Sequence, residues 1–239
     1  MGALHRLRNG VREIRRGNYM SGLRRLAKQI RRAIAPRRGK PAVGTVADVQ
    51  AVYDDVFTND EGFDVLDTTN EPKLAYVLDF ARTIDGTVLD AGCGRGSVLR
   101  YMLDNGIDAF GVELSKAACD MYLQGVPHTN ADIISWADQG HTYPGLICLD
   151  VLEHIPPDQI EAVIDALARL APKGLLGIAN HSSIHNGHEL HVIQKGHRWW
   201  VSKLGEKFAK VDVMPPHADD SVLVDHFKAD RFFFIRVER

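Results

Sequence analysis

The chain contains 239 residues with a mass of 26.6 kDa, of which 45% are hydrophobic and 25% are charged. This length suits one large domain or one domain with an appendage, and the composition excludes a wholly disordered, collagen-like or disulfide-scaffold chain. The formal net charge of −2 hides a division along the chain. Residues 1–40 hold 13 Lys or Arg and one acid, a net charge of +12, whereas residues 41–239 carry −14.

The composition also indicates a compartment. No stretch of 18 apolar residues predicts a membrane-spanning helix, and the first residues lack the apolar core of a secretory signal. The three cysteines, Cys93, Cys119 and Cys148, are far apart within apolar segments, as is typical of reduced core thiols. We therefore expect a cytoplasmic protein, with peripheral membrane association as an option set by its N-terminal segment.

Residues 4–34 predict one or two basic amphipathic helices, because apolar residues recur at three- and four-residue steps between arginines. Residues 35–41 contain two prolines and a glycine and predict a linker. The chain is thus divided into a helical extension with its linker, residues 1–40, and a main domain, residues 41–239. Such a helix can dock on the acidic domain or bind an anionic membrane surface through residues 1–35, and nucleic acid is the less favoured partner.

From residue 46 onward, apolar stretches of strand length alternate with helical patterns. This alternation predicts an α/β fold with a mostly parallel sheet that is covered by helices on both faces. The acidic segment 219–226 is expected to be a solvated connection. The predicted strands are residues 87–90, 109–113, 145–149, 174–179, 211–213 and 232–235, and the predicted helices are residues 71–84, 96–105, 115–123 and 157–170.

The most informative stretch is residues 88–96, in which a strand runs into glycines at positions 92, 94 and 96 before a helix opens at Ser97. Glycines at the start of a helix allow a tight turn and let a ligand approach backbone N–H groups. The pattern matches neither the dinucleotide fingerprint, which needs glycine at position 97, nor the phosphate-binding loop. Glu113 ends the next strand, where a carboxylate can accept hydrogen bonds from the ribose of an adenosine-containing ligand.

These features resemble the class I S-adenosylmethionine-dependent methyltransferases. The resemblance implies a Rossmann-like, seven-stranded, mostly parallel sheet of order 3-2-1-4-5-7-6, with helices on both faces and an antiparallel last strand. It implies S-adenosylmethionine as the cofactor. The resemblance spans residues 70–239 and is carried by residues 89–96, 111–115, 130–133 and 149–155.

The resemblance also implies a cofactor site. Glu113 would hold the ribose, Leu114 would cover the adenine ring, and Asp132 would accept a hydrogen bond from the adenine amine. In family members a helix near the position of Tyr53 often closes over the cofactor. The full set of implied cofactor-binding residues, of which the last two would lie near the sulfonium, is Asp90, Gly92, Cys93, Gly94, Gly96, Glu113, Leu114, Asp132, Ile133, Leu149 and Asp150.

Methyl transfer from a sulfonium is an in-line displacement, so the protein mainly aligns the acceptor, excludes water and removes a proton from a hydroxyl acceptor. Histidine has the intrinsic pKa of a base that works near neutrality. Five of the eleven histidines lie between residues 181 and 197, after the fifth strand, and most of them are expected to be polar loop residues. The residues assigned to catalysis are His154, His181 and His191.

A metal-assisted alternative remains open. Asp150, Glu153 and His154 repeat the acid-x-x-acid-His spacing that some metal-assisted family members have, and His181 can complete the set. However, Asp stands where that pattern begins with Glu, and the same run also occurs in members that work without a metal. No metal ligand is therefore assigned.

The sequence predicts O-methylation of a small molecule, a glycan or a lipid-linked sugar, with a histidine as general base. Residues 150–153 lack the Asp/Asn-Pro-Pro-Tyr/Phe motif of enzymes that methylate amino groups of nucleic acids, and Cys148 lacks the proline expected beside a base-methylating nucleophile. The alternatives are an RNA or protein methyltransferase that is recruited by the basic extension, and a cofactor-binding module without turnover.

Overall fold

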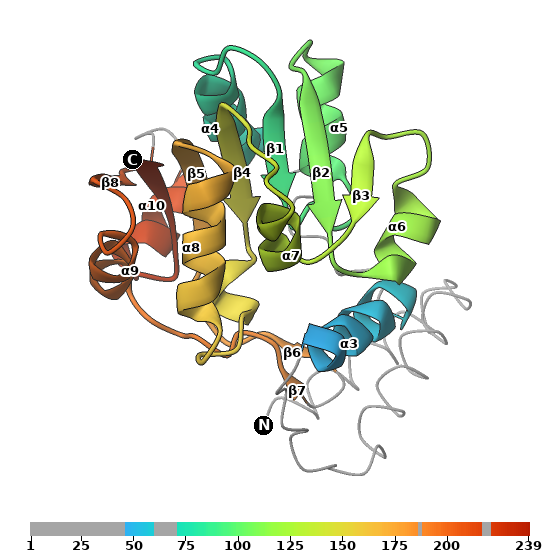
Figure 1. Ribbon diagram of the computed structural model, residues 1–239. Coiled ribbons are helices and arrows are strands. Elements are labelled where there is room, and N and C mark those ends of the chain that lie inside the picture. Colours follow the sequence, from blue (N-terminus) through green and yellow to red (C-terminus); the bar gives the residue numbers. More distant parts are fainter. Residues whose placement is uncertain (1–45, 60–70, 186–187, 217–220) are drawn as a thin grey trace, which may run out of the picture. The chain divides into compact units, whose positions relative to one another are not determined.

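The computed structural model describes residues 46–59, 71–185, 188–216 and 221–239 (Figure 1). The basic extension and linker, residues 1–40, lie outside the described residues, so their helices stay a prediction. Most of the described chain belongs to one large unit. A separate two-stranded hairpin consists of β6 (Ile184–His185) and β7 (His188–Glu189).

The large unit is built on a seven-stranded sheet with the order β3-β2-β1-β4-β5-β9-β8. Strands β1 to β5 are parallel, and β9 runs antiparallel between β5 and β8. Counted in chain order within this sheet, the strand order is 3-2-1-4-5-7-6, so the predicted topology is confirmed. The strands are β1 (Val88–Ala91), β2 (Ala109–Glu113), β3 (His128–Asn130), β4 (Gly145–Leu149), β5 (Lys173–Ala179), β8 (Lys210–Met214) and β9 (Phe232–Glu238).

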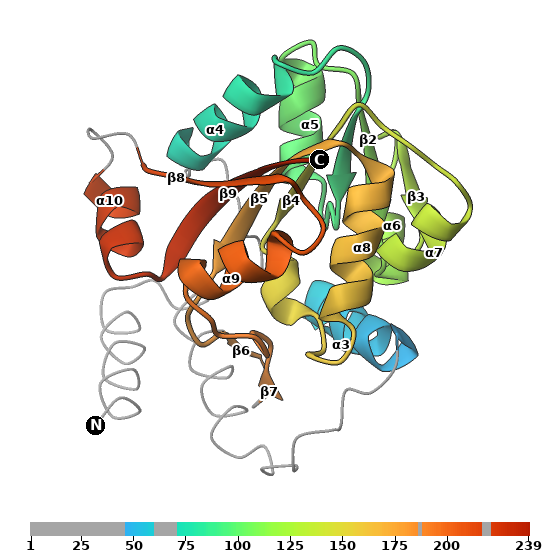
Figure 2. The same cartoon turned by 60° about the vertical axis from the view of Figure 1, so that its left-hand side comes forward.

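Helices cover both faces of this sheet. Successive side chains of a strand point to opposite faces, so the apolar residues on each face are buried against helices. The helical segments are α3 (Val46–Asn59), α4 (Glu71–Ala81), α5 (Ser97–Asp104), α6 (Lys116–Tyr122), α7 (Ile133–Asp138), η1 (Leu152–His154), α8 (Ile160–Leu170), α9 (His197–Leu204) and α10 (Ser221–Lys228). Leu89 belongs to an apolar cluster shared with α8 and α9, whereas its neighbour Val88 belongs to one shared with α4 and α5. Figure 2 shows α8 and α9 on one side of the sheet and α4 and α5 on the other.

Helix α8 illustrates why the predicted pattern folds as it does. Its apolar residues recur at three- and four-residue steps and all point into the core. Each such side chain contributes about 1.5–3 kcal/mol of burial free energy, which is more than the weak intrinsic helix propensity of an 11-residue segment supplies. The buried apolar residues of α8 with 4% exposure or less, apart from Ala166, are Ile160, Val163, Ile164, Leu167 and Leu170.

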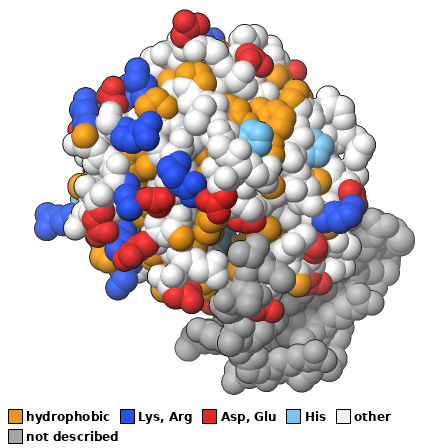
Figure 3. All heavy atoms as spheres, in the orientation of Figure 1, with side chains coloured by type: hydrophobic (Ala, Val, Ile, Leu, Met, Phe, Trp, Pro, Cys, Tyr) orange, Lys and Arg blue, Asp and Glu red, His pale blue; other side chains and the backbone are white. Residues whose placement is uncertain are grey.

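The outer face of α8 carries charges that are paired with the neighbouring helix. Glu161 forms an ion pair with Lys203 of α9, and Asp165 lies 2.7 Å from Nζ of Lys207, just beyond that helix. In the space-filling view, Lys and Arg side chains are interspersed with Asp and Glu (Figure 3). This face of the main domain therefore has mixed charge rather than a continuous basic surface.

One sequence prediction is wrong. The segment 219–226 was expected to be a solvated connection, but α10 begins at Ser221 and continues to Lys228. Leu223 of this helix is 6% exposed and packs into the cluster beneath α4 and α5. The acidic residues around it concealed this apolar anchor in the sequence.

Two further sequence predictions concern the state of the cysteines and the absence of a membrane-spanning helix. Cys93, Cys119 and Cys148 are free and buried, as expected for core cysteines. Within the described part of the chain, no helix is both long and apolar enough to cross a membrane.

Candidate functional site

The glycine segment between β1 and α5 forms a tight loop at the carboxyl end of β1. The backbone amides of Gly92 and Cys93 donate to the carbonyl oxygen of Val112 at 2.8 and 3.1 Å, which holds the loop against β2. Gly92 has a φ of +80°, and a Cβ at this position would lie 2.5 Å from Cγ2 of Val151. Because only glycine tolerates both conditions, position 92 lets this loop approach the segment that follows β4.

The carboxylate of Glu113, at the end of β2, is held by two backbone amides. Gly94 N–H donates to Oε2 and Ser115 N–H donates to Oε1, both at 2.7 Å. Glu113 is 6% exposed. Burial raises the pKa of this carboxyl, while the hydrogen bonds from Ser115 and Gly94 oppose the rise. The two bonds fix the carboxylate between the glycine loop and the start of α6.

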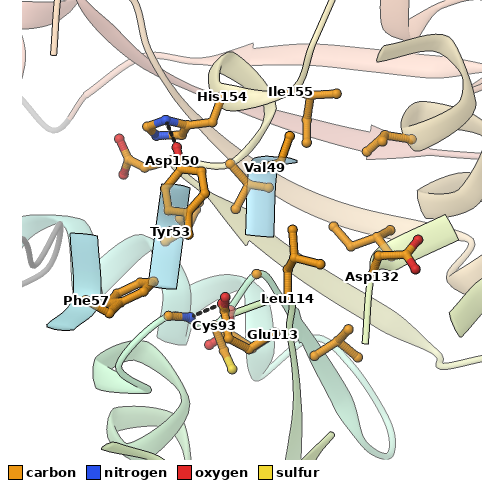
Figure 4. A pocket seen from close by; sticks show the side chains of 18 of the residues that line it. Val49, Tyr53, Phe57, Cys93, Glu113, Leu114, Asp132, Asp150, His154 and Ile155 are labelled. Carbon is orange, nitrogen blue, oxygen red and sulfur yellow. Dashed lines mark hydrogen bonds between the residues drawn. The ribbon is translucent and has the colours of Figure 1, made fainter. Parts of the chain in front are cut away.

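A cavity opens beside this loop, where the carboxyl ends of β1, β2 and β4 meet (Figure 4). Open α/β sheets bind ligands at this edge. Among the described residues that line the cavity, four carry carboxylates, Asp90, Glu113, Asp132 and Asp150, and Arg95 carries a guanidinium. The excess of carboxylates favours a ligand that bears positive charge.

Two of these carboxylates have an unused oxygen. Within the described part of the chain, Oδ2 of Asp90 and Oδ2 of Asp150 are buried and lack a hydrogen-bond partner. Burial, assisted by the nearby charge of Glu113, raises the pKa of Asp90 to about 7. Burial likewise raises the pKa of Asp150, whose backbone adopts a φ of +50° where β4 ends. The hydrogen-bonding capacity of both oxygens is therefore not met by the described part of the chain.

Helix α3 forms one wall of the cavity. Val49, Tyr53 and Phe57, spaced four residues apart on one face of the helix, all line it (Figure 4). Sequence analysis noted only Tyr53 and missed the other two, although the four-residue apolar spacing was visible. Asp54 anchors α3 to the start of α6, because its Oδ1 accepts from Ser115 Oγ at 2.6 Å and from the amide of Ala117 at 3.0 Å.

The cavity brings together almost the complete set of sequence-predicted cofactor residues, although their roles in binding stay a prediction. Gly96 is the exception, because it does not line the cavity but occupies the N-cap of α5 with a φ of +76°. Asp132 also caps α7, since its Oδ1 accepts from the amide of Ser135 at 2.9 Å. The predicted residues that line the cavity are Asp90, Gly92, Cys93, Gly94, Glu113, Leu114, Asp132, Ile133, Leu149 and Asp150.

Of the three histidines predicted to be catalytic, only His154 lines the cavity. Its Nδ1 lies 2.5 Å from the hydroxyl oxygen of Tyr53 and 3.2 Å from the carbonyl oxygen of Leu190. Because a carbonyl oxygen can only accept, we assign the ring proton to Nδ1, which leaves the lone pair on Nε2. Burial, together with His191, lowers the pKa of His154 to about 3, so the ring is neutral at physiological pH.

Of the other two predicted histidines, His191 lies next to His154 and His181 lies next to His191, and neither lines the cavity. The rings of His154 and His191 are 4.6 Å apart, and those of His191 and His181 are 4.9 Å apart. His191 is buried, and its Nδ1 donates to the carbonyl oxygen of His181 at 2.6 Å. The fold therefore brings the three histidines assigned to catalysis together, although only His154 lines the cavity.

His197, Trp199 and Trp200, which follow the histidine group in the chain, make contacts that stabilise the fold. His197 Nδ1 lies 2.9 Å from Asp230 Oδ1, near the start of α9. Trp200 is fully buried in the cluster beneath α8, and Trp199 packs against that cluster. Neither tryptophan lines the cavity, so the pair belongs to the core rather than to an acceptor pocket.

A family model described as a methyltransferase domain matches residues 13–217. The chain therefore belongs to the S-adenosylmethionine-dependent methyltransferases. The resemblance drawn from the motifs, and S-adenosylmethionine as the cofactor of the family, are confirmed.

Three similar proteins illustrate this membership. The ubiquinone biosynthesis O-methyltransferase of Vibrio cholerae is 29% identical over 126 residues, which cover 47% of this chain and 49% of that protein. The chain thus matches about half the length of this curated relative. Among solved structures, the DhpI–SAH complex superimposes with a TM-score of 0.59 at 13% identity, over 82% of this chain and 98% of that one. A methyltransferase from Archaeoglobus fulgidus has a TM-score of 0.54 at 14% identity, over 71% and 94% of the two chains, so both structures share the fold.

Proposed function

We propose that the chain transfers the methyl group of S-adenosylmethionine to a hydroxyl oxygen of a small molecule, a glycan or a lipid-linked sugar. The observation that carries the proposal is His154, a neutral imidazole in the wall of the cavity, next to the end of β4. A neutral imidazole can take the proton that a hydroxyl acceptor must lose. The curated relatives support oxygen as the acceptor atom, because they are named O-methyltransferases. The match to this chain covers about half the length of each relative.

The charges that line the cavity suit S-adenosylmethionine. This cofactor carries an ammonium and a sulfonium, and the unused oxygens of Asp90 and Asp150 offer acceptors and negative charge. The glycine loop packs closely on Val151, which also lines the cavity, because a Cβ at Gly92 would lie 2.5 Å from Cγ2 of that residue. When bound, the cofactor supplies a methyl group on a positively charged sulfur, which is an activated leaving group.

The residues of the chain bind and orient the reactants. Glu113, fixed by two amides, retains lone pairs that can accept from the ribose hydroxyls. Val49 and Phe57 on α3 provide an apolar wall that excludes water from the donor. Asp90 is the candidate partner for the ammonium group of the cofactor, because its Oδ2 has no hydrogen-bond partner within the described part of the chain.

The acceptor proton is assigned to Nε2 of His154. In the proposed reaction, the hydroxyl O–H bond breaks toward Nε2 while the oxygen attacks the methyl carbon in line with the departing sulfur. The low pKa of His154 makes it a weak base, so the groups behind it have to assist the transfer. The hydroxyl of Tyr53, 2.5 Å from Nδ1 of His154, is the nearest candidate, followed by His191, 4.6 Å away between ring centres.

The basic extension is proposed to locate the enzyme at an anionic membrane surface through residues 1–35. The full chain should co-sediment with vesicles that contain phosphatidylglycerol but not with pure phosphatidylcholine vesicles. Deletion of residues 1–40 should abolish this binding. Unchanged binding of the truncated protein would reject the membrane role of the extension.

The central test is transfer of labelled methyl groups from S-adenosylmethionine into a fractionated cell extract. The purified chain should label the small-molecule pool or the lipid and glycan pool, and the product should contain an O-methyl group by mass spectrometry. Glu113→Ala serves as the control that cannot hold the cofactor. Label confined to RNA or protein would reject the proposed acceptor class, and retained cofactor binding with no transfer to any pool would indicate a module without turnover.

A further inference from the structure

Four basic side chains gather where β5 ends and β9 begins. They come from α4, the segment after β5, α10 and the residue before β9, and together they form what we call the basic cluster: Lys73, His181, His226 and Arg231. Arg231 is exposed, and the other three are half-buried. This concentration of basic groups contrasts with the net charge of −14 that residues 41–239 carry.

Backbone hydrogen bonds of Arg231 hold three members of the basic cluster together. The amide of Arg231 donates to the carbonyl oxygen of His226 at 2.8 Å. The carbonyl oxygen of Arg231 accepts from the amide of Asn180 at 2.7 Å, and His181 is the next residue in the chain. The start of β9 therefore joins the end of α10 to the segment that follows β5.

Lys73 reaches the same place from α4. Its Nζ lies 4.0 Å from the ring centre of Phe232, the residue after Arg231, in a cation–π contact. Leu74 and Leu223 belong to the same apolar cluster as Phe232, so α4 and α10 both pack beside the start of β9. The packed helix and the aromatic ring thus hold the ammonium group near the segment that carries Arg231.

The basic cluster borders the cavity at two points. Asp150 lines the cavity, and burial raises its pKa while the nearby charges of Lys73 and His181 lower it. The ring of His181 lies 4.9 Å from that of His191, which in turn lies 4.6 Å from that of His154 in the cavity wall. The basic cluster is therefore next to the proposed base, at the edge of the sheet where ligands bind.

The described residues supply little negative charge to balance the basic cluster. Within the described part of the chain, neither Lys73 nor Arg231 forms an ion pair. Asp230, the residue before Arg231, is already paired with His197 at 2.9 Å. Like charges that lie close together repel one another, and an anion that binds among them relieves the repulsion.

His226 reports the same excess of positive charge. Burial lowers the pKa of His226, and the nearby charge of Arg231 lowers it further. Lys73 and His181 act in the same direction, and Asp225 opposes them. The side chains that face His226 are thus mainly basic.

We propose that the basic cluster binds an anionic oxygen group of the acceptor, a phosphate or a carboxylate, while the acceptor hydroxyl lies at His154. This role rests on the proposed function and narrows its acceptor class to anionic hydroxyl compounds. Arginine binds both groups through paired hydrogen bonds, and lysine and histidine add further donors. The two substrates are then sorted by charge, because the cavity carboxylates attract the cationic cofactor and the basic cluster attracts the acceptor.

Binding is tested with inorganic phosphate and with acetate, each added to the ¹⁵N-labelled full chain in the absence of cofactor and acceptor. The amide signals of Asn180 and Arg231 should shift and saturate at millimolar concentration. These signals report the basic cluster separately from any anion that binds the basic extension, residues 1–40. The ion that binds more tightly identifies the anionic group as a phosphate or a carboxylate.

Variants of two cluster residues test the assignment. Arg231→Gln and Lys73→Gln should each weaken anion binding by about tenfold, the effect of one hydrogen bond to a charged group. Arg231→Lys, which keeps the charge, should lose less affinity than Arg231→Gln. The matched control is Arg236→Gln, because Arg236 also lies on β9 and over a phenylalanine ring, that of Phe80 at 5.7 Å, but pairs with Leu175 toward the opposite edge of the sheet.

Thermal unfolding identifies variants that do not fold, and Arg231→Gln and Lys73→Gln should melt within a few degrees of the wild type. Shifts of the Asn180 and Arg231 amides that are absent in the wild type would overturn the anion site. Shifts that are as large in both variants as in the wild type would overturn it too.

The charge of the methylated product separates a failure of this inference from a failure of the proposed function. O-methylation removes the hydroxyl proton and adds the methyl group, so the anionic group of the acceptor stays in place. The labelled product from the cell extract should therefore be retained by an anion exchanger at neutral pH. A labelled O-methyl product without negative charge would reject the anion site and leave the proposed function intact. Anion binding without methyl transfer to any pool would reject the proposed function and support the anion site.

Discussion

The backbone amide of Gly94 donates a 2.7 Å hydrogen bond to Oε2 of Glu113, across 19 residues of sequence. The bond joins the loop after β1 to the end of β2. A carboxylate that is proposed to hold the ribose therefore also holds the loop along which the rest of the cofactor would lie. Loss of this side chain removes a ligand contact and releases the backbone N–H groups of Gly94 and Ser115.

Replacement of Glu113 should separate these two effects. Glu113→Gln keeps an acceptor for one amide and should weaken S-adenosylmethionine binding by about tenfold to a hundredfold, because hydrogen bonds to a charged acceptor contribute about 1.5–3 kcal/mol. Glu113→Ala should abolish detectable binding and also lower the melting temperature. Isothermal calorimetry and thermal unfolding measure the two quantities. Wild-type affinity in Glu113→Ala would contradict the assignment of the cofactor site.

The pKa of Asp90, about 7, predicts a pH-dependent affinity. A cationic ligand favours the ionised carboxylate, so affinity for S-adenosylmethionine should fall up to about tenfold per pH unit below 7. Asp90→Asn should bind weakly, and its affinity should vary much less with pH between 5.5 and 8.5. Because the carboxyl of Glu113 also has a raised pKa, Glu113→Gln serves as the comparison for its contribution. An equal slope in wild type and Asp90→Asn would assign the titration elsewhere.

Asp90 should also lower the stability of the ligand-free protein. Its folded-state pKa of about 7 lies above the ordinary value of 3.8, so the folded state binds more protons and loses stability as pH rises from 4 to 7. Above pH 7 the penalty is on the order of 4 kcal/mol or less. Asp90→Asn should therefore melt higher than the wild type at pH 8, with no such gain at pH 4. Chemical denaturation at the two pH values measures the difference.

Gly92→Ala should disrupt the glycine loop for two separable reasons. The added Cβ would lie 2.5 Å from Cγ2 of Val151, and the φ of +80° strains any residue with a Cβ. The strain alone costs about 1–2 kcal/mol. The double variant Gly92→Ala with Val151→Ala should recover the part due to the clash but not the part due to the backbone. Unfolding free energies of the two single variants and the double variant test this cycle, and full recovery would show that φ is not the constraint.

Tyr53→Phe should reduce turnover without loss of cofactor affinity. The substitution removes the hydroxyl oxygen that accepts from Nδ1 of His154 at 2.5 Å but keeps the ring, whose centre lies 5.6 Å from the imidazole. We expect kcat to fall by about tenfold, the effect of one interaction of about 1.4 kcal/mol. The matched control is Tyr122→Phe, which removes a hydroxyl that bonds to the carbonyl of Phe57 on α3. Equal losses in both variants would point to docking of α3 rather than to His154.

Six strands of the sheet were predictable because their signals are local, whereas the three-residue strand β3 (His128–Asn130) was not among the predicted strands. The strand, the glycines and Glu113 occur within 26 residues, and their meaning depends on spacing along the chain. The same holds for the antiparallel strand β9, whose apolar stretch Phe232–Ile235 belongs to the observed strand Phe232–Glu238.

The details of the site depend on contacts between distant segments, which local patterns do not contain. Tyr53 meets His154 across 101 residues, and His191 is held beside Glu153 by an amide two residues further along, that of Ile193. The sequence therefore identified the histidine group but not that His191, rather than His181, lies beside His154. Similarly, the sequence predicted that Asp132 binds the cofactor but did not predict that Asp132 caps α7.

Helix α3 is both a wall of the cavity and a segment attached to the domain by a few identifiable bonds, among them those of Asp54. Its undocking would open the cavity, so any ligand that requires a closed cavity opposes that motion. At a ligand concentration one hundred times the dissociation constant, the added free energy is about 2.7 kcal/mol. Amide hydrogen exchange along α3 should slow by up to about a hundredfold on saturation, so these amides would report occupancy of the cavity independently of turnover.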